Sequence, residues 1–121
     1  MCDVLVVDDD DLVRMTLSSV LEMEGWNVRE AGSPQEALPK GELQAQCNLL
    51  VTDVDLGTKE NGFELAARLR SVHPDTPVVY VSGRPWLFDG RVMAADERNL
   101  AKPFRAEELT RMVRELLNCR G

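Results

Sequence analysis

The stretch "VLVVDDDDL", residues 4–12, runs from the branched apolar residues of a buried strand straight into four consecutive aspartates. Two unit charges ~4 Å apart repel by roughly 4 kcal/mol at an effective dielectric near 20, so such a cluster either spreads into water or meets a cation. Aspartate is also a preferred helix cap, and Asp10 and Asp11 are expected only to begin the helix that follows. For Asp8 and Asp9, the choice between capping and cation binding depends on what the fold brings beside them.

Beyond this stretch, short apolar runs alternate with longer amphipathic ones, a pattern typical of βα units around a parallel sheet. Three runs are apolar on both faces, as expected for strands covered by helices on each side. The predicted strands are residues 3–7, 48–52 and 77–82, with an alternating, edge-like strand at 26–31 and the weakest one at 98–101. Apolar residues at helical spacing predict helices over 13–24, 63–72 and 106–117, and an irregular one over 85–97 that contains Gly90 and two aspartates. Ser33, Pro34 and Glu36 have the pattern of a helix cap, first residue and capping-box acid, and Pro39 is expected to shorten or kink the helix that they begin.

These five strands and five helices predict an α/β fold, a doubly wound parallel sheet. With 121 residues, the chain is long enough for a single core and is expected to be one domain, residues 1–121. The sequence contains no internal repeat or linker.

Composition excludes several classes of partner. A net charge of -7 without a basic cluster argues against nucleic acid. No apolar stretch approaches the ~20 residues of a membrane span. Strand sequence directly after Met1 leaves no room for a signal peptide, so we expect a cytoplasmic protein. Three cysteines, an odd number without metal-ligand spacing, are expected to be reduced thiols.

In doubly wound sheets the carboxyl ends of the strands share one edge, where ligands bind. The residues at these ends are Asp8 and Asp9, then Asp53, Ser82 and Lys102. Crowded carboxylates must take up protons or a hard divalent cation, and Mg²⁺ with carboxylate and phosphate ligands fits this set. A carboxylate beside that ion can act as a nucleophile and form an acyl phosphate.

The chain resembles the receiver domains of two-component response regulators over essentially its whole length. The resemblance rests on "VLVVDDDDLVR", "LLVTDVDL", "NGFELAARLR", "VVYVSG" and "AKPF". It implies a flavodoxin-like sheet with strand order 2-1-3-4-5, as in the chemotaxis member of the family.

The resemblance also implies roles for the acidic residues. Asp53 corresponds to the phosphoacceptor, which attacks the phosphohistidine of a sensor histidine kinase or a histidine phosphotransfer protein. Asp9 and Asp53 correspond to direct Mg²⁺ ligands, Asp55 to a ligand through its backbone carbonyl, and Asp8 to one acting through water. The expected protein is a signalling phosphoacceptor that catalyses its own phosphorylation and dephosphorylation, not an enzyme with a separate substrate.

Two further positions correspond to the family's phosphoryl-binding residues. Ser82 stands where the family has a hydroxyl that hydrogen-bonds the phosphoryl group, and Lys102 where it has a phosphoryl-contacting lysine. The bond between Lys102 and Pro103 is one that the family holds in cis.

The sequence departs from the family at three places. Asn99 replaces the usual aromatic residue that couples phosphorylation to the surface of the fourth helix, fifth strand and fifth helix. The loop over residues 55–62 lacks a common proline and is one residue longer. Asp55 and Arg84 flank the phosphoryl position with opposite charges, and we hypothesise that they pair and gate the entry of hydrolytic water.

Two alternatives from other classes stay open. "DVDLGT", residues 53–58, is close to the Asp-x-Asp motif of Mg-dependent aspartyl-phosphate phosphatases, although that family carries it on the first strand. A phosphorylation-independent interaction module would keep the fold without binding Mg²⁺. Within the receiver interpretation three alternatives stay open: a free-standing receiver, a phosphorelay shuttle, or a receiver cut from a larger hybrid kinase or regulator. The oligomeric state is not predicted.

Overall fold

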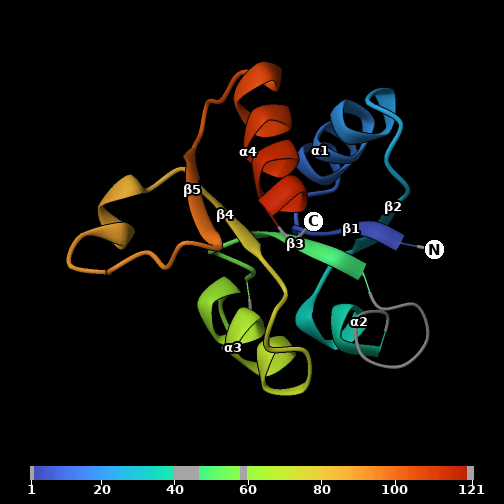
Figure 1. Ribbon diagram of the computed structural model, residues 1–121. Helices are drawn as coiled ribbons and strands as arrows, with labels where there is room; N and C mark the ends of the chain where they lie inside the picture. Colours follow the sequence, from blue (N-terminus) through green and yellow to red (C-terminus); the bar gives the residue numbers. More distant parts are fainter. Residues whose placement is uncertain (1, 40–46, 58–59, 120–121) are drawn as a thin grey trace.

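The computed structural model describes residues 2–39, 47–57 and 60–119. Its centre is a five-stranded parallel sheet with the order β2-β1-β3-β4-β5 (Figure 1). The strands are β1 (Cys2–Val7), β2 (Val28–Ala31), β3 (Cys47–Asp53), β4 (Val78–Ser82) and β5 (Glu97–Ala101). The predicted fold class and strand order are confirmed, and the two weaker strand predictions correspond to the two edges. No helix within the described ranges has the length and apolar character to cross a membrane.

Four α-helices cover the two faces of this sheet in the described chain. They are α1 (Asp11–Met23), α2 (Pro34–Pro39), α3 (Gly62–Val72) and α4 (Ala106–Cys119). Helices α1 and α4 lie on one face, and α2 and α3 on the other (Figure 1). The α2 helix ends at the proline that was expected to shorten it.

The prediction of five helices is wrong over residues 85–97. Only a single 3-10 turn, η2 (Pro85–Phe88), forms there. A proline favours the start of a helix, but no side chain caps this turn, and Asp89 directly after it is extended with φ -61° and ψ 131°. Gly90 then takes a positive φ of 79°, which ends any continuation. The chain reaches β5 without the helix that usually precedes it in this topology.

The turns at the sheet's carboxyl edge are fixed by capping side chains. Asp10 accepts hydrogen bonds from the amides of Leu12 (2.9 Å) and Val13 (3.2 Å), so it caps α1 as predicted. Asn61 and Glu64 form a reciprocal capping box at the start of α3. Both helices therefore begin at defined points beside the ends of β1 and β3.

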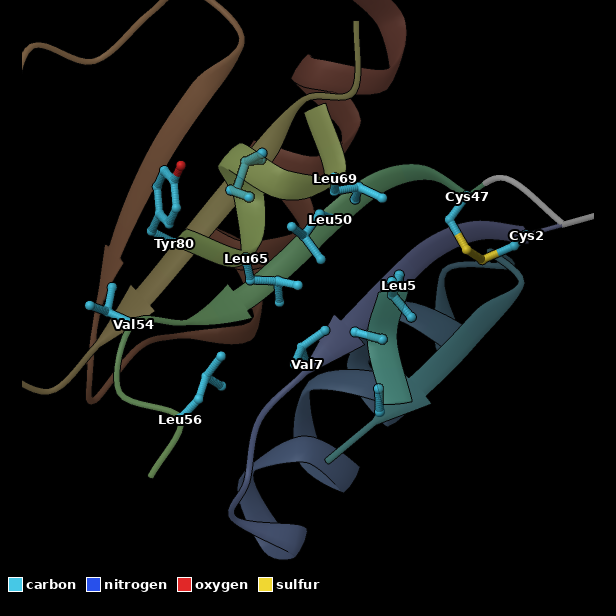
Figure 2. Packing of buried hydrophobic residues seen from close by; sticks show 14 of the residues in the cluster. Cys2, Leu5, Val7, Cys47, Leu50, Val54, Leu56, Leu65, Leu69 and Tyr80 are labelled. Atoms are coloured by element: carbon cyan, nitrogen blue, oxygen red, sulfur yellow. A yellow bond between two sulfur atoms is a disulfide. The ribbon is translucent and has the colours of Figure 1, made fainter. Parts of the chain in front are cut away.

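Alternate strand residues enter two separate cores, because successive side chains point to opposite faces of a sheet. Leu5 and Leu50 pack with the α2 and α3 side, where Leu65 and Tyr80 complete the cluster shown in Figure 2. The other strand positions pack under α1 and α4; this second cluster includes Val4, Val6, Leu17, Leu21, Leu49, Val51, Leu109, Val113 and Leu116. Burial on both faces holds the strand ends in fixed positions.

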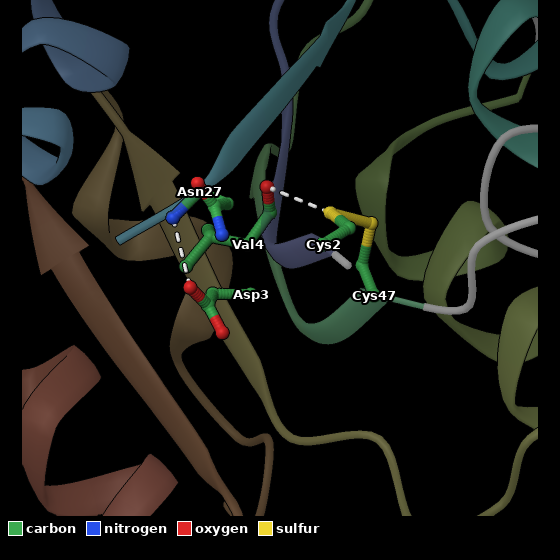
Figure 3. Close-up of a disulfide and its surroundings, with 5 residues drawn as sticks. All are labelled: Cys2, Asp3, Val4, Asn27 and Cys47. Carbon is green, nitrogen blue, oxygen red and sulfur yellow. Dashed lines mark hydrogen bonds between the residues drawn. A yellow bond between two sulfur atoms is a disulfide. The ribbon is translucent and has the colours of Figure 1, made fainter. Parts of the chain in front are cut away.

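The expectation of reduced thiols is wrong for two of the three cysteines. Cys2 and Cys47 are partners in the register of β1 and β3, with Cα atoms 4.5 Å apart, and they form a disulfide (Figures 2 and 3). Both are buried, with 1% and 6% of their surfaces exposed. Parallel pairing brings the first residues of two neighbouring strands together, which cysteine counting does not reveal. The side chain of Cys119 lies outside the described part of the chain.

Candidate functional site

The carboxyl ends of the strands place the predicted polar residues at one edge of the sheet. Asp8 follows β1, Asp53 ends β3, Ser82 ends β4 and Lys102 follows β5. The register pairs Asp53 with Val81, and the Lys102 amide donates to the Ser82 carbonyl at 2.8 Å. Side chains up to 94 positions apart along the chain therefore meet at one edge, because β1, β3, β4 and β5 are consecutive in the sheet.

Three carboxylates form the centre of this edge. Asp8, Asp9 and Asp53 each offer one oxygen, and these oxygens all lie within 4.8 Å of one another. Asp8 is fully buried and Asp53 is 6% exposed, whereas Asp9 faces solvent. Oδ1 of Asp8 accepts a hydrogen bond from the Asp10 amide at 2.9 Å, but its buried Oδ2 has no hydrogen-bond partner among the described residues. An oxygen of this kind favours a cation nearby, since a buried acceptor without a partner is costly.

Lys102 is the cation that the described chain itself brings to these carboxylates. Its Nζ lies 3.3 Å from Asp53 Oδ2 and 3.6 Å from Asp8 Oδ2. Burial raises the pKa of Asp8 to about 6, and repulsion by Asp53 adds to the rise. Burial also raises the pKa of Asp53, although Lys102 opposes that shift. One ammonium does not balance the charges of two buried carboxylates, so the ionised site keeps a net negative charge.

The loops after β3 and β4 close around the Asp53 carboxylate. The Asp55 amide donates to Asp53 Oδ1 at 3.2 Å, and the Arg84 amide donates to the Oγ of the fully buried Ser82 at 2.9 Å. The Asp55 carboxylate is not part of the acidic cluster, because it binds the Arg84 guanidinium through both oxygens. The predicted contact between these two side chains is confirmed. The cis bond between Lys102 and Pro103 is present as well.

Sequence reasoning missed Arg14, which holds the end of β1 in place. Arg14 donates from Nη1 to the Asp8 carbonyl at 2.9 Å and from Nε to Glu30 at 3.2 Å, so it fixes the end of β1. An arginine on a polar helix face gives no signal of such a role in the sequence.

Two glycines allow the chain to pass close to Asp53 and Asp9. A Cβ at Gly62 would lie 2.3 Å from the Asp53 carbonyl oxygen, and one at Gly57 would lie 2.7 Å from Asp9 Oδ2. Gly57 also has a positive φ of 69°. The two glycines stand in the loop that was predicted to be longer than usual, of which residues 58–59 lie outside the described structure.

Comparison with known proteins identifies relatives over nearly the whole chain. Residues 4–114 match the family model "Response regulator receiver domain". The chain is 37% identical over 117 residues to the sensor kinase CckA of Brucella abortus, covering 94% of this chain and 12% of that protein. It is equally identical to the transcriptional regulatory protein CpxR of Escherichia coli K12, covering 94% of this chain and 48% of that one.

Solved structures agree with these sequence matches. A response regulator receiver protein from Sinorhizobium medicae superposes with a TM-score of 0.85 at 28% identity, covering 99% of this chain and 97% of that one. The receiver domain of the hybrid histidine kinase CckA superposes with a TM-score of 0.80 at 28% identity, covering 95% and 98%. The chain spans about half or less of the length of the curated relatives it matches.

Proposed function

The chain belongs to the response regulator receiver domain family, and from this premise we propose that Asp53 accepts a phosphoryl group from a phosphohistidine in a Mg²⁺-dependent reaction. The family is that of the phosphoacceptor domains of two-component systems. The observation that supports the assignment to Asp53 is the buried carboxylate group itself. Asp53 lies within reach of two further carboxylates and of the Lys102 ammonium, at the end of the central strand β3.

The residues present fit a magnesium ion. Asp8 has a buried oxygen without a hydrogen-bond partner among the described residues, and an oxygen of Asp9 and one of Asp53 lie within 4.8 Å of it and of each other. Hard oxygen donors in this number suit Mg²⁺, which usually keeps several waters and a phosphate oxygen as its other ligands. Asp9 and Asp53 would hold the ion directly and Asp8 through water, with the Asp55 carbonyl as a further ligand. The bound ion would neutralise charge on the transferring phosphoryl group.

The reaction uses Asp53 as the nucleophile. One of its oxygens attacks phosphorus, the new oxygen–phosphorus bond forms, and the phosphorus–nitrogen bond to the donor histidine breaks. The electron pair of the broken bond stays on the imidazole nitrogen, which ends as neutral imidazole after taking a proton from water. Lys102, 3.3 Å from Asp53 Oδ2, neutralises the phosphoryl oxygens, and the Ser82 hydroxyl can donate to one of them.

A partner that carries a phosphohistidine needs a surface beside Asp53. An apolar groove of about 350 Å³ adjoins the site and is formed by α1 and the loop after β5. Its lining includes Lys102 itself, Phe104 and Leu12, whose surface is 74% exposed. We propose that a sensor histidine kinase or a histidine phosphotransfer protein docks here, since this contact would place its histidine over the carboxylates. We also propose that the protein acts in the cytoplasm.

Intact-mass measurement after incubation with acetyl phosphate and Mg²⁺ tests this function. We expect the wild type to gain one phosphoryl group, and the Asp53→Asn variant and the Mg²⁺-free sample not to gain it. A wild-type protein that gains no mass would overturn the proposal. Sustained hydrolysis of an aryl phosphate, abolished by Asp55→Asn, would instead support a phosphatase. The ion pair with Arg84 argues against that function, because it occupies the Asp55 carboxylate that would have to act as the acid or base.

A further inference from the structure

An ion pair joins the two loops that follow β3 and β4, beside the proposed phosphoacceptor. Arg84 donates from Nε to Asp55 Oδ2 at 2.9 Å and from Nη2 to Asp55 Oδ1. Each member stands two residues after a site residue, Asp55 after Asp53 and Arg84 after Ser82. The pair therefore bridges the loops that follow β3 and β4, next to Asp53 and Ser82.

Each member of the pair is also attached to the site through its own backbone. The Asp55 amide donates to Asp53 Oδ1 at 3.2 Å, and the Arg84 amide donates to Ser82 Oγ at 2.9 Å. Phosphorylation of Asp53 would change the acceptor of the first hydrogen bond, and a phosphoryl oxygen would compete with Ser82 Oγ for the Arg84 amide of the second. A single chemical event would therefore disturb both backbone contacts that hold the pair.

The charges favour an exchange of partners for the guanidinium. Both side chains are about half exposed, at 50% for Arg84 and 47% for Asp55, so water weakens their attraction. A phosphoryl group carries about two negative charges and three strong acceptor oxygens, and a guanidinium binds such a group through two parallel hydrogen bonds. A phosphoryl group on Asp53 is thus a stronger partner for Arg84 than the single charge of Asp55.

Arg84 is also the residue from which the following segment begins. It precedes the 3-10 turn η2, and its carbonyl accepts the hydrogen bond of the Leu87 amide at 3.0 Å. That turn has no side-chain cap and carries Trp86, which is 60% exposed. Asn99 is exposed in β5 and provides no aromatic ring to respond to the site. A displacement of Arg84 would therefore pass directly to η2.

We propose that Arg84 is a phosphoryl-binding residue that leaves Asp55 when Asp53 is phosphorylated, and that this exchange moves the η2 turn with Trp86. The inference rests on the proposed function. Position 99 of this chain is an asparagine and not an aromatic residue. The proposal gives Arg84, on the loop after β4, the role of coupling phosphorylation to a movement of the surface.

Trp86 fluorescence reports the exchange in the full chain. Trp26→Phe leaves Trp86 as the sole tryptophan, since the sequence has two. This parent protein, in Mg²⁺ throughout, is treated with acetyl phosphate, and the change in emission is divided by the phosphorylated fraction from intact mass. We expect a change for the parent, and its loss in Arg84→Gln.

Two further variants complete the test. Arg114→Gln removes a distant arginine whose ion pair with Glu24 is similarly exposed, and it is expected to keep the full change. Asp55→Asn frees Arg84 without phosphorylation, and its emission is expected to differ from that of the parent before acetyl phosphate is added. This arm does not depend on how well any variant is phosphorylated.

The outcomes separate the two proposals. A parent that gains a phosphoryl group without a change in Trp86 emission would overturn the exchange and leave the proposed function intact. An unchanged normalised signal in Arg84→Gln would do the same. A parent that gains no phosphoryl group would overturn the proposed function and this inference with it.

Discussion

Asp8 is the most deeply buried of the three carboxylates in the site. It is fully buried, one of its oxygens has no hydrogen-bond partner among the described residues, and Asp53 lies close by. Lys102, at 3.6 Å, supplies one charge for two carboxylates. A proton or a divalent cation can supply the rest, so the two should compete at Asp8.

This competition predicts a pH dependence of stability. The pKa of Asp8 is raised by burial from 3.8 to about 6, so the folded protein binds this proton more tightly than the unfolded chain does. The stabilisation is fully present below about pH 4 and is lost as the pH rises through about 6. In EDTA, the urea midpoint of the wild type should therefore rise relative to that of Asp8→Asn as the pH falls from about 7 to about 4. Parallel curves for the two proteins would contradict this.

Arg84 is expected to lengthen the lifetime of the acyl phosphate on Asp53. In the proposed phosphorylated state the Arg84 guanidinium leaves Asp55 and binds the phosphoryl group beside the path of hydrolytic water, so Arg84→Ala should admit water more easily. Exposed ion pairs contribute ~0.2–1 kcal/mol, which corresponds to dephosphorylation that is up to about fivefold faster. The measurement is the decay of the phosphorylated mass after removal of acetyl phosphate, with Arg114→Ala as the control. Equal rates for wild type and Arg84→Ala would refute the gating role.

At the scale of elements, α3 and the segment after β4 form one unit beside the site. The rings of Phe63, Tyr80 and Phe88 pack together, with centroids 4.8 Å apart for the first pair and 5.9 Å for Phe63 and Phe88. The Arg91 guanidinium lies 3.6 Å from the centre of the Phe63 ring. This packing holds the irregular residues after η2 against the start of α3, where a regular helix is missing.

The position of α3 depends on Gly62. A Cβ there would lie 2.3 Å from the Asp53 carbonyl oxygen, a backbone atom that cannot turn aside. Gly62→Ala should therefore move α3 and cost about 1–3 kcal/mol of unfolding free energy, with weaker Mg²⁺ binding because Asp53 moves as well. Urea unfolding and Mg²⁺ titration measure the two effects.

Gly83→Ala is the matched control for stability, because a Cβ at Gly83 meets nothing within 4 Å. It should unfold close to the wild type. A Gly62→Ala protein as stable as Gly83→Ala would show that α3 does not need this close approach.

At the scale of the whole molecule, the disulfide closes a long loop. It joins β1 to β3 across a separation of 45 residues, at the end of the sheet opposite to the acidic site. Loop-closure entropy for this length gives at most about 4 kcal/mol of stabilisation. Reduction should therefore lower the urea midpoint while leaving phosphorylation by acetyl phosphate in place.

The comparison for this prediction is the Cys2→Ala/Cys47→Ala double variant. Its midpoint should match that of the reduced wild type and should not respond to a reductant. A wild-type midpoint that is the same with and without reductant would contradict the stabilising role of the bond.

Much of this architecture could be predicted from the sequence, because apolar runs and the residues at their ends are local features. Asp53, Ser82 and Lys102 follow such runs directly, so the topology alone brings them together. The disulfide could not be predicted, because its pairing depends on which strands are neighbours. The absence of a helix over residues 85–97 could not be predicted, because it depends on the backbone conformation of Asp89 and Gly90. The role of Gly62 could not be predicted either, because it depends on the contact between the start of α3 and the end of β3.

The most direct test of the central claim is to locate the phosphoryl group. Borohydride reduces an aspartyl phosphate to homoserine, so peptide mass mapping after acetyl phosphate, Mg²⁺ and borohydride identifies the modified residue. The prediction is homoserine at position 53 alone, absent without Mg²⁺. Homoserine at another aspartate, or none in a protein that has gained phosphoryl mass, would contradict the assignment of Asp53 as the phosphoacceptor.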